Sequence, residues 1–193
     1  QNPIKKKIKQ FSIPKIQEFR KQAVDLIENY GFKLDIINGG GSGSIYSSAK
    51  DPVLTEVTVG SGFLCSHLFS NYEGLNLAPA IFFAIETVRK PDNEYITCMG
   101  GGYIASGSMG KDRLPEVFLP KGIESTDIEG FGEVQTPFKI VDQKVKIELG
   151  DPVLLRHAKA GELAEHFNYY HIYKDKKIIG KELTYRGEGL VFI

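Results

Sequence analysis

The chain has no net charge, few cysteines and no long apolar run. Its 24 Lys and Arg residues equal its 24 Asp and Glu residues in number, so no overall field attracts nucleic acid or anionic lipid. The longest apolar candidate, residues 77–88, is interrupted by Pro79 and Glu86 and is shorter than the roughly 20 residues of a membrane span. The amino end has no signal-peptide pattern. We therefore expect a cytoplasmic protein with no nucleic-acid partner and no membrane contact.

Cysteine is scarce too. Cys65 and Cys98 lie in apolar surroundings and lack the spacing of metal ligands, so we expect two free, buried thiols in a reducing compartment. The remaining composition, with 41% hydrophobic and 25% charged residues, is that of a globular protein. The first residue is Gln1 rather than Met, which indicates a fragment, or a processed or shortened chain.

The first part of the chain has the order of an α/β unit. Ser12 is placed to cap a helix with Pro14 in its first turn, and apolar residues recur at helical spacing as far as Tyr30. Gly31 supplies a left-handed stop. Residues 32–38 are apolar enough for a buried strand, and a glycine-rich loop follows at once. Folds of this class bind ligands at the carboxyl ends of their strands.

After about residue 75 the pattern changes to short strand-like runs between turn residues. We expect an α/β segment followed by a mainly β domain. One helix and one or two strands leave an apolar face unpaired, so either upstream sequence or the β domain covers that face. The expected strands are residues 80–88, 95–99, 132–141, 144–149, 152–157, 167–174 and 177–179, with a hairpin turn at Asp175.

The glycine-rich loop is the strongest local signal for binding. Its backbone N–H groups and two hydroxyls can surround a phosphate dianion, although a flexible surface loop has the same composition. It lacks the lysine of a P-loop. A second stretch, residues 100–105, fits the dinucleotide fingerprint, but Gly107 and Gly110 follow at once and favour a turn-rich β segment. The loop consists of Gly39, Gly40, Gly41, Ser42, Gly43 and Ser44.

Two further groups of residues are candidates for chemistry. His157 and Lys159 would share a strand face, with Glu162 close by, and a histidine beside a lysine suits a neutral base or a metal ligand. A histidine with satisfied hydrogen bonds at a domain junction is the alternative. Tyr185 and Arg186 can offer a phenol and a guanidinium to a substrate carboxylate, or can form a surface turn with a salt bridge.

Together these stretches resemble the alanine-racemase-like group of fold-type III pyridoxal-phosphate enzymes, especially the D-serine dehydratase and D-threonine aldolase branch. They also look like proteins labelled amino acid deaminase/aldolase. The stretches that carry the resemblance are residues 39–44, 55–62, 100–103, 132–137, 150–163 and 185–189.

The resemblance implies that residues 1–80 are the last part of an alanine-racemase-type (β/α) barrel and that residues 81–193 are a C-terminal, mainly β domain. It implies a homodimer acting on a small amino-acid substrate. Pyridoxal 5'-phosphate would be held on a lysine and would stabilise a carbanion at the substrate Cα. The loop at residues 39–44 would bind its phosphate, His157 and Lys159 would be catalytic, and Tyr185 and Arg186 would bind substrate.

Two departures from the family pattern limit which of the family's properties we expect in this chain. No lysine here lies in the context of the Schiff-base lysine, which we expect upstream of Gln1, so that this chain alone would be inactive. Dehydratase and aldolase members place a metal on a His-x-Cys or His-x-Asp pair, whereas this chain has His157-Ala158-Lys159, and a protonated lysine is no ligand. No metal site is therefore expected, although His157 is the one possible ligand for a divalent metal.

The resemblance therefore predicts part of a D-amino acid deaminase, dehydratase, aldolase or racemase. The alternative is a non-catalytic, truncated remnant that acts as an interaction or dimerisation module.

Overall fold

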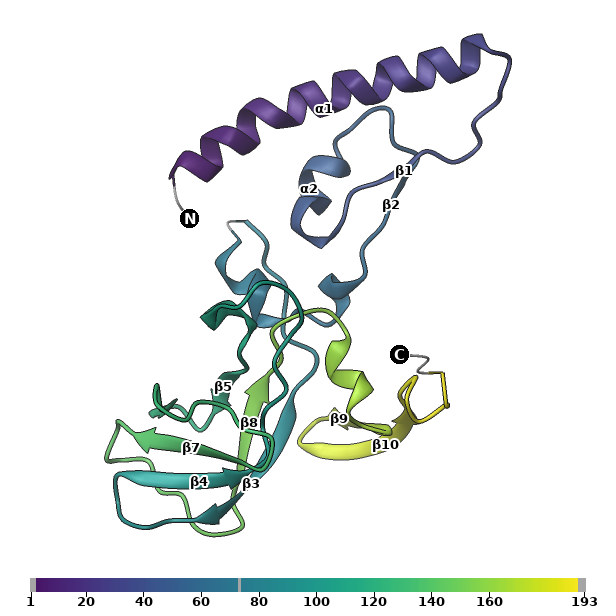
Figure 1. Cartoon of the computed structure of the whole chain (residues 1–193). Helices are drawn as coiled ribbons and strands as arrows, with labels where there is room; N and C mark the ends of the chain where they lie inside the picture. Colours follow the sequence, from purple (N-terminus) through teal and green to yellow (C-terminus); the bar gives the residue numbers. More distant parts are fainter. Residues whose placement is uncertain (1–2, 73, 191–193) are drawn as a thin grey trace. The chain divides into compact units, whose positions relative to one another are not determined.

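The computed structural model describes residues 3–72 and 74–190 (Figure 1). The chain divides into two compact units. Unit 1 comprises residues 1–63 and 69–77, and unit 2 comprises residues 64–68 and 78–193. Helices and a short parallel strand pair make up unit 1, and antiparallel strands dominate unit 2. The chain is thus mixed α/β with a mainly β second unit, while its assignment to the end of a (β/α) barrel stays a prediction.

Helix α1 (Pro3–Asn29) is longer than the sequence predicts. The expected start at Ser12 is wrong: Pro14 lies inside the helix, and the Ser12 hydroxyl donates to the Ile8 carbonyl instead of capping an end. An internal proline removes one helical hydrogen bond, yet the helix continues on both sides of it. Gly31, at φ 88°, follows the helix end as predicted.

The apolar side chains of α1 and of the segment after it are largely exposed. Phe11, Phe19 and Tyr30 are 74%, 66% and 76% exposed. The buried strand expected at residues 32–38 is also wrong: Phe32 and Ile36 are both 67% exposed, and residues 32–37 are irregular. Apolar character alone does not make a strand where no partner strand lies alongside.

Among the described residues of unit 1, the paired strands are β1 (Asn38–Gly39) and β2 (Glu56–Val57), which run parallel. The Asn38 side chain bonds to Thr58 and Glu56, which fixes the register of this short pair. An ion pair between Arg20 of α1 and the buried carboxylate of Asp51 ties the helix to the rest of the unit.

Unit 2 is built on a six-stranded antiparallel sheet with the order β5-β8-β3-β4-β7-β6 (Figure 1). Alternate side chains of β3, beginning with Phe83 and Ile85, are buried, and the neighbouring strands add Ile96, Phe138 and Leu155 to the same core. The strands are β3 (Phe83–Arg89), β4 (Tyr95–Met99), β5 (Glu116–Leu119), β6 (Ile123–Ser125), β7 (Gln135–Ile140) and β8 (Pro152–Arg156).

Several of the expected strands are confirmed and others are corrected. β4 has the predicted bounds, and β3, β7 and β8 lie within or close to the expected runs. Residues 144–149 form no strand; Ile147 is buried there, but the backbone around it is irregular. Strands β5 and β6 were not expected. Residues 100–105 are irregular and are followed only by the three-residue 3-10 helix η4 (Lys111–Arg113) before β5, in agreement with the turn-rich segment predicted there.

A separate hairpin follows, formed by β9 (Tyr169–Lys174) and β10 (Lys177–Leu183). Its two turn residues, Asp175 and Lys176, have φ values of 49° and 63°, as a tight two-residue hairpin turn requires. The predicted turn at Asp175 is therefore confirmed. Both strands are largely exposed along their length.

Both cysteines are buried thiols outside any disulfide, as expected: Cys65 is 4% and Cys98 is 0% exposed. Burial raises the pKa of the Cys98 thiol, and a hydrogen bond with Thr87 only partly opposes this effect. Among the helices of residues 3–72 and 74–190, none is both long and apolar enough to cross a membrane.

Candidate functional site

The glycine-rich loop of unit 1 leaves β1 and turns directly into two short helices. The 3-10 helix η1 (Ser42–Ser44) and the single-turn helix α2 (Ile45–Ser48) follow without a break. Gly40 has φ 98°, and a Cβ added to it would lie 2.8 Å from the Ser48 Oγ atom and 3.1 Å from Val57 Cγ1. Both backbone conformation and packing therefore require glycine at this position.

A second loop, Gly60-Ser61-Gly62, lies against the first. The Ser42 hydroxyl, on a side chain only 7% exposed, accepts a 2.7 Å hydrogen bond from the Gly62 backbone N–H and lies 3.2 Å from the Ser61 hydroxyl. The second loop follows β2, which pairs with β1, so two adjacent strands each end in a glycine-serine loop. Sequence reasoning did not assign residues 60–62 to the site.

Two glycines of these loops face open space. At Gly41 and Gly60 an added Cβ would meet nothing within 4 Å, and the φ of Gly41, 165°, is an extended conformation open to any residue. Neither strain nor packing explains glycine at Gly41. The absence of a side chain instead leaves the loop backbone open to a ligand, as a phosphate cradle requires.

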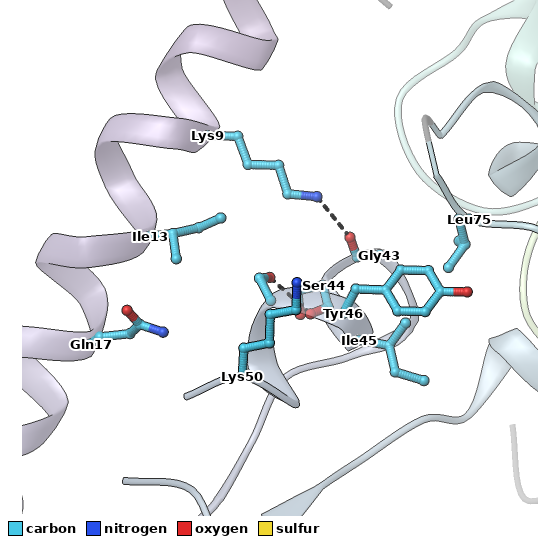
Figure 2. Close-up of a pocket in the computed structure, with 10 residues that line it drawn as sticks. Lys9, Ile13, Gln17, Gly43, Ser44, Ile45, Tyr46, Lys50 and Leu75 are labelled. Atoms are coloured by element: carbon cyan, nitrogen blue, oxygen red, sulfur yellow. Dashed lines mark hydrogen bonds between the residues drawn. The ribbon is translucent and has the colours of Figure 1, made fainter. Parts of the chain in front are cut away.

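Unit 1 contains a cavity of about 510 Å³ between α1 and the end of the glycine-rich loop. Figure 2 shows the residues that line it. Lys9 and Gln17 line it from α1, and Gly43, Ser44 and Lys50 line it from the opposite side. The Lys9 ammonium donates a 3.1 Å hydrogen bond to the Gly43 carbonyl. Two lysines beside loop hydroxyl and backbone groups favour an anionic ligand.

In unit 2, His157 lies one residue beyond the end of β8 and is 3% exposed. Among the described residues, neither of its ring nitrogens has a hydrogen-bond partner of normal geometry. Burial lowers the pKa of His157, and nearby backbone groups of Ala160 and Ile81 only partly offset this effect. Burial, rather than the neighbouring lysine considered from the sequence, thus favours the neutral form of this imidazole.

His157 and Lys159 line the same small cavity, of about 20 Å³, together with Glu162 and Tyr103. The Lys159 Nζ atom lies 2.7 Å from the Ser106 hydroxyl and 3.2 Å from Glu162 Oε1. Burial acts to raise the pKa of Glu162, but hydrogen bonds from Ser106 and Lys159 outweigh it and lower that pKa. Ser106, which is remote in sequence from Lys159, was not expected in this group.

Tyr185 and Arg186 do not belong to the lining of this cavity. The Tyr185 hydroxyl donates a 3.1 Å hydrogen bond to the Gly161 carbonyl. Burial, followed by the charge of Glu165, raises the pKa of Tyr185, so it is a neutral hydrogen-bond donor. Arg186 is exposed. Their role in substrate binding stays a prediction, as do the roles of His157, Lys159 and residues 39–44.

The fold matches part of a D-threonine aldolase. The solved structure of that enzyme from Filomicrobium marinum is similar over 93% of this chain, with a TM-score of 0.79 and 13% sequence identity. This chain spans about half the length of that protein, covering 48% of it. No protein-family model and no curated protein matches the sequence.

At 13% identity the likeness shows a shared fold and not a shared reaction. The predicted resemblance to enzymes of the D-threonine aldolase kind is therefore confirmed as a resemblance of fold. The particular branch, and the expectation that this chain is the C-terminal half of a longer enzyme, stay predictions.

Proposed function

We propose that this chain is part of a pyridoxal-phosphate-dependent lyase or racemase of D-amino acids, to which it supplies the phosphate loop and part of the substrate site. The likeness of fold to a D-threonine aldolase over 93% of the chain carries the proposal. The pair of glycine-serine loops at the ends of β1 and β2 supports it from the geometry of the chain itself.

The two loops fit a phosphate group. In (β/α) barrels a phosphate is often held by the loops after the last two strands and by the start of a short extra helix. Here the loops follow the adjacent parallel strands β1 and β2, and each leads into a short 3-10 helix. Ser42 fixes one loop against the other through Gly62, while Gly41 and Gly60 leave their backbone exposed.

When bound, pyridoxal phosphate supplies an electron sink for negative charge at the substrate Cα. In this proposal Gly41, Ser42 and the Gly60–Gly62 loop bind the phosphate oxygens. The neutral imidazole of His157 can accept a proton or a hydrogen bond, and the ammonium of Lys159 can donate to a substrate oxygen. A small amino acid as substrate, a homodimer and a cytoplasmic location complete the proposal.

The second candidate is a non-catalytic interaction or dimerisation module. The exposed apolar side chains of α1, among them Phe11 and Phe19, favour it, because such groups gather at protein–protein interfaces. The same exposure also agrees with the first proposal, in which further parts of a barrel would cover α1. Ligand binding separates the two candidates.

The test compares binding of pyridoxal phosphate with that of pyridoxal, which lacks the phosphate, by equilibrium dialysis on this chain. The first proposal expects binding that requires the phosphate and that inorganic phosphate competes away. Ser42→Ala should weaken it by about 10- to 100-fold, the loss of a hydrogen bond to a charged group. Ser12→Ala, which changes only a bond within exposed α1, should have no effect.

Equal binding of pyridoxal and pyridoxal phosphate would refute the proposed phosphate site. If neither compound binds and the chain associates in a concentration-dependent way in analytical ultracentrifugation, the second candidate, an interaction or dimerisation module, is favoured. Fixation of one cofactor equivalent to a single lysine of this chain by borohydride would show that the Schiff-base lysine is present here after all.

A further inference from the structure

The residues after β8 carry a fixed positive charge beside a buried, neutral histidine. Lys159 is held by the Ser106 hydroxyl at 2.7 Å and by the Glu162 carboxylate at 3.2 Å. Glu162 itself accepts hydrogen bonds from the backbone N–H and the hydroxyl of Ser106, at 2.8 and 2.7 Å. Two groups from two separate segments thus fix the position of the ammonium, and His157 lines the same cavity.

The groups around His157 do not fit the divalent metal that the sequence resemblance implies. Two residues after the histidine, the position of the second ligand is filled by Lys159, whose ammonium has no lone pair. Both carboxylate oxygens of Glu162 are engaged by Ser106, and one of them also by Lys159. Across residues 3–72 and 74–190, no group of three or more His, Cys, Asp or Glu side chains could hold a metal ion.

We propose that Lys159 replaces the metal ion at this strand end, so that the protein carries a built-in cation beside His157 and binds no divalent metal there. The use of this cation in catalysis rests on the proposed function, whereas its effect on metal binding does not. The identity of the side chain at position 159 alone would then decide whether this site binds a metal ion or carries its own cation.

A fixed ammonium beside a neutral imidazole suits a hydroxyl group. Two of the three donor positions of the Lys159 ammonium are taken by Ser106 Oγ and Glu162, while the contact of Nζ with the Ser106 carbonyl, at 3.5 Å, is long for a hydrogen bond. The third donor position is available to a ligand oxygen, and an unpaired His157 nitrogen can accept the hydroxyl proton. A carboxylate ligand could accept a hydrogen bond from Lys159 but has no proton to donate to His157, and the negative charge of Glu162 would repel it.

The test measures cobalt(II) binding by the visible absorbance of the bound ion, without pyridoxal phosphate, so that its result is independent of the proposed cofactor. The wild-type chain should bind no cobalt at His157. Lys159→Asp and Lys159→Cys each remove the ammonium and introduce a ligand beside His157, and each should therefore show the visible absorbance of bound cobalt that the wild type lacks. Lys159→Arg keeps the cation and should match the wild type.

His157→Gln combined with Lys159→Asp identifies the site, because the gained affinity should disappear. Circular dichroism confirms that each variant is folded. Cobalt binding by the wild type that is lost in His157→Gln would overturn the proposal. Folded Lys159→Asp and Lys159→Cys variants that both fail to gain affinity would overturn it as well, since Lys159 would then not be what excludes the metal.

Discussion

Replacing Ser42 by alanine should separate the two loops of the proposed phosphate site. The Ser42 hydroxyl is the acceptor for the buried Gly62 N–H, at 2.7 Å. The alanine variant leaves that N–H without this partner, and an unpaired buried donor costs about 1–3 kcal/mol. This cost corresponds to an opening equilibrium of the loop pair about 5- to 150-fold more favourable.

Amide hydrogen exchange at Gly62, followed by NMR, measures that opening directly. Exchange at Gly62 should accelerate by this factor in Ser42→Ala. Ser47→Ala is the matched control, because the bond that the structure describes for the Ser47 hydroxyl goes to the Ser44 carbonyl and not to the Gly60–Gly62 loop. Unchanged exchange at Gly62 in Ser42→Ala would refute the view that Ser42 holds the loops together.

Two further predictions concern unit 2. Thr136→Val should lower stability by about 1–3 kcal/mol in urea unfolding, because the Thr136 hydroxyl, on a side chain 0% exposed, donates to the Gly100 carbonyl at 2.6 Å; an unchanged unfolding midpoint would contradict this. Burial lowers the pKa of His157 below its usual 6.5, so the unfolded chain binds more protons below that pH. Stability should fall on acidification through this range, by up to about 1.4 kcal/mol per pH unit, and less steeply in His157→Gln.

Much of the secondary structure of unit 2 could be predicted from the sequence, because its strands and turns are marked by a few neighbouring residues. The β-branched and aromatic residues of β4 and the turn at Asp175 are each local to a few adjacent residues, and both elements were predicted. The short strand β6 (Ile123–Ser125) has no clear pattern of its own; it forms because β7 lies beside it. Residues 32–38 show the opposite case, an apolar run that gains strand structure only where Glu56 lies opposite Asn38.

The residues of the candidate site also fall into those that the sequence could predict and those that it could not. The Gly39–Ser44 loop and His157 could be singled out because glycine runs and isolated histidines are visible in one sequence. Their partners could not, since Ser61 is 19 residues from Ser42 and Glu162 is 56 residues from Ser106. Only the folded chain shows which distant polar groups meet, and these partners decide the chemistry that each group can perform.

The positions of the two cysteines allow the reactivity of their thiols to report on the conformation of unit 2. Both cysteines belong to unit 2, and unit 1 has none. Because Cys98 is 0% exposed in the sheet and burial raises the pKa of its thiol, a thiol reagent can reach it only when the sheet opens. Labelling kinetics of the unmodified protein would therefore follow unit 2 alone, and any effect of a ligand of unit 1 on these kinetics would measure the energetic coupling between the two units.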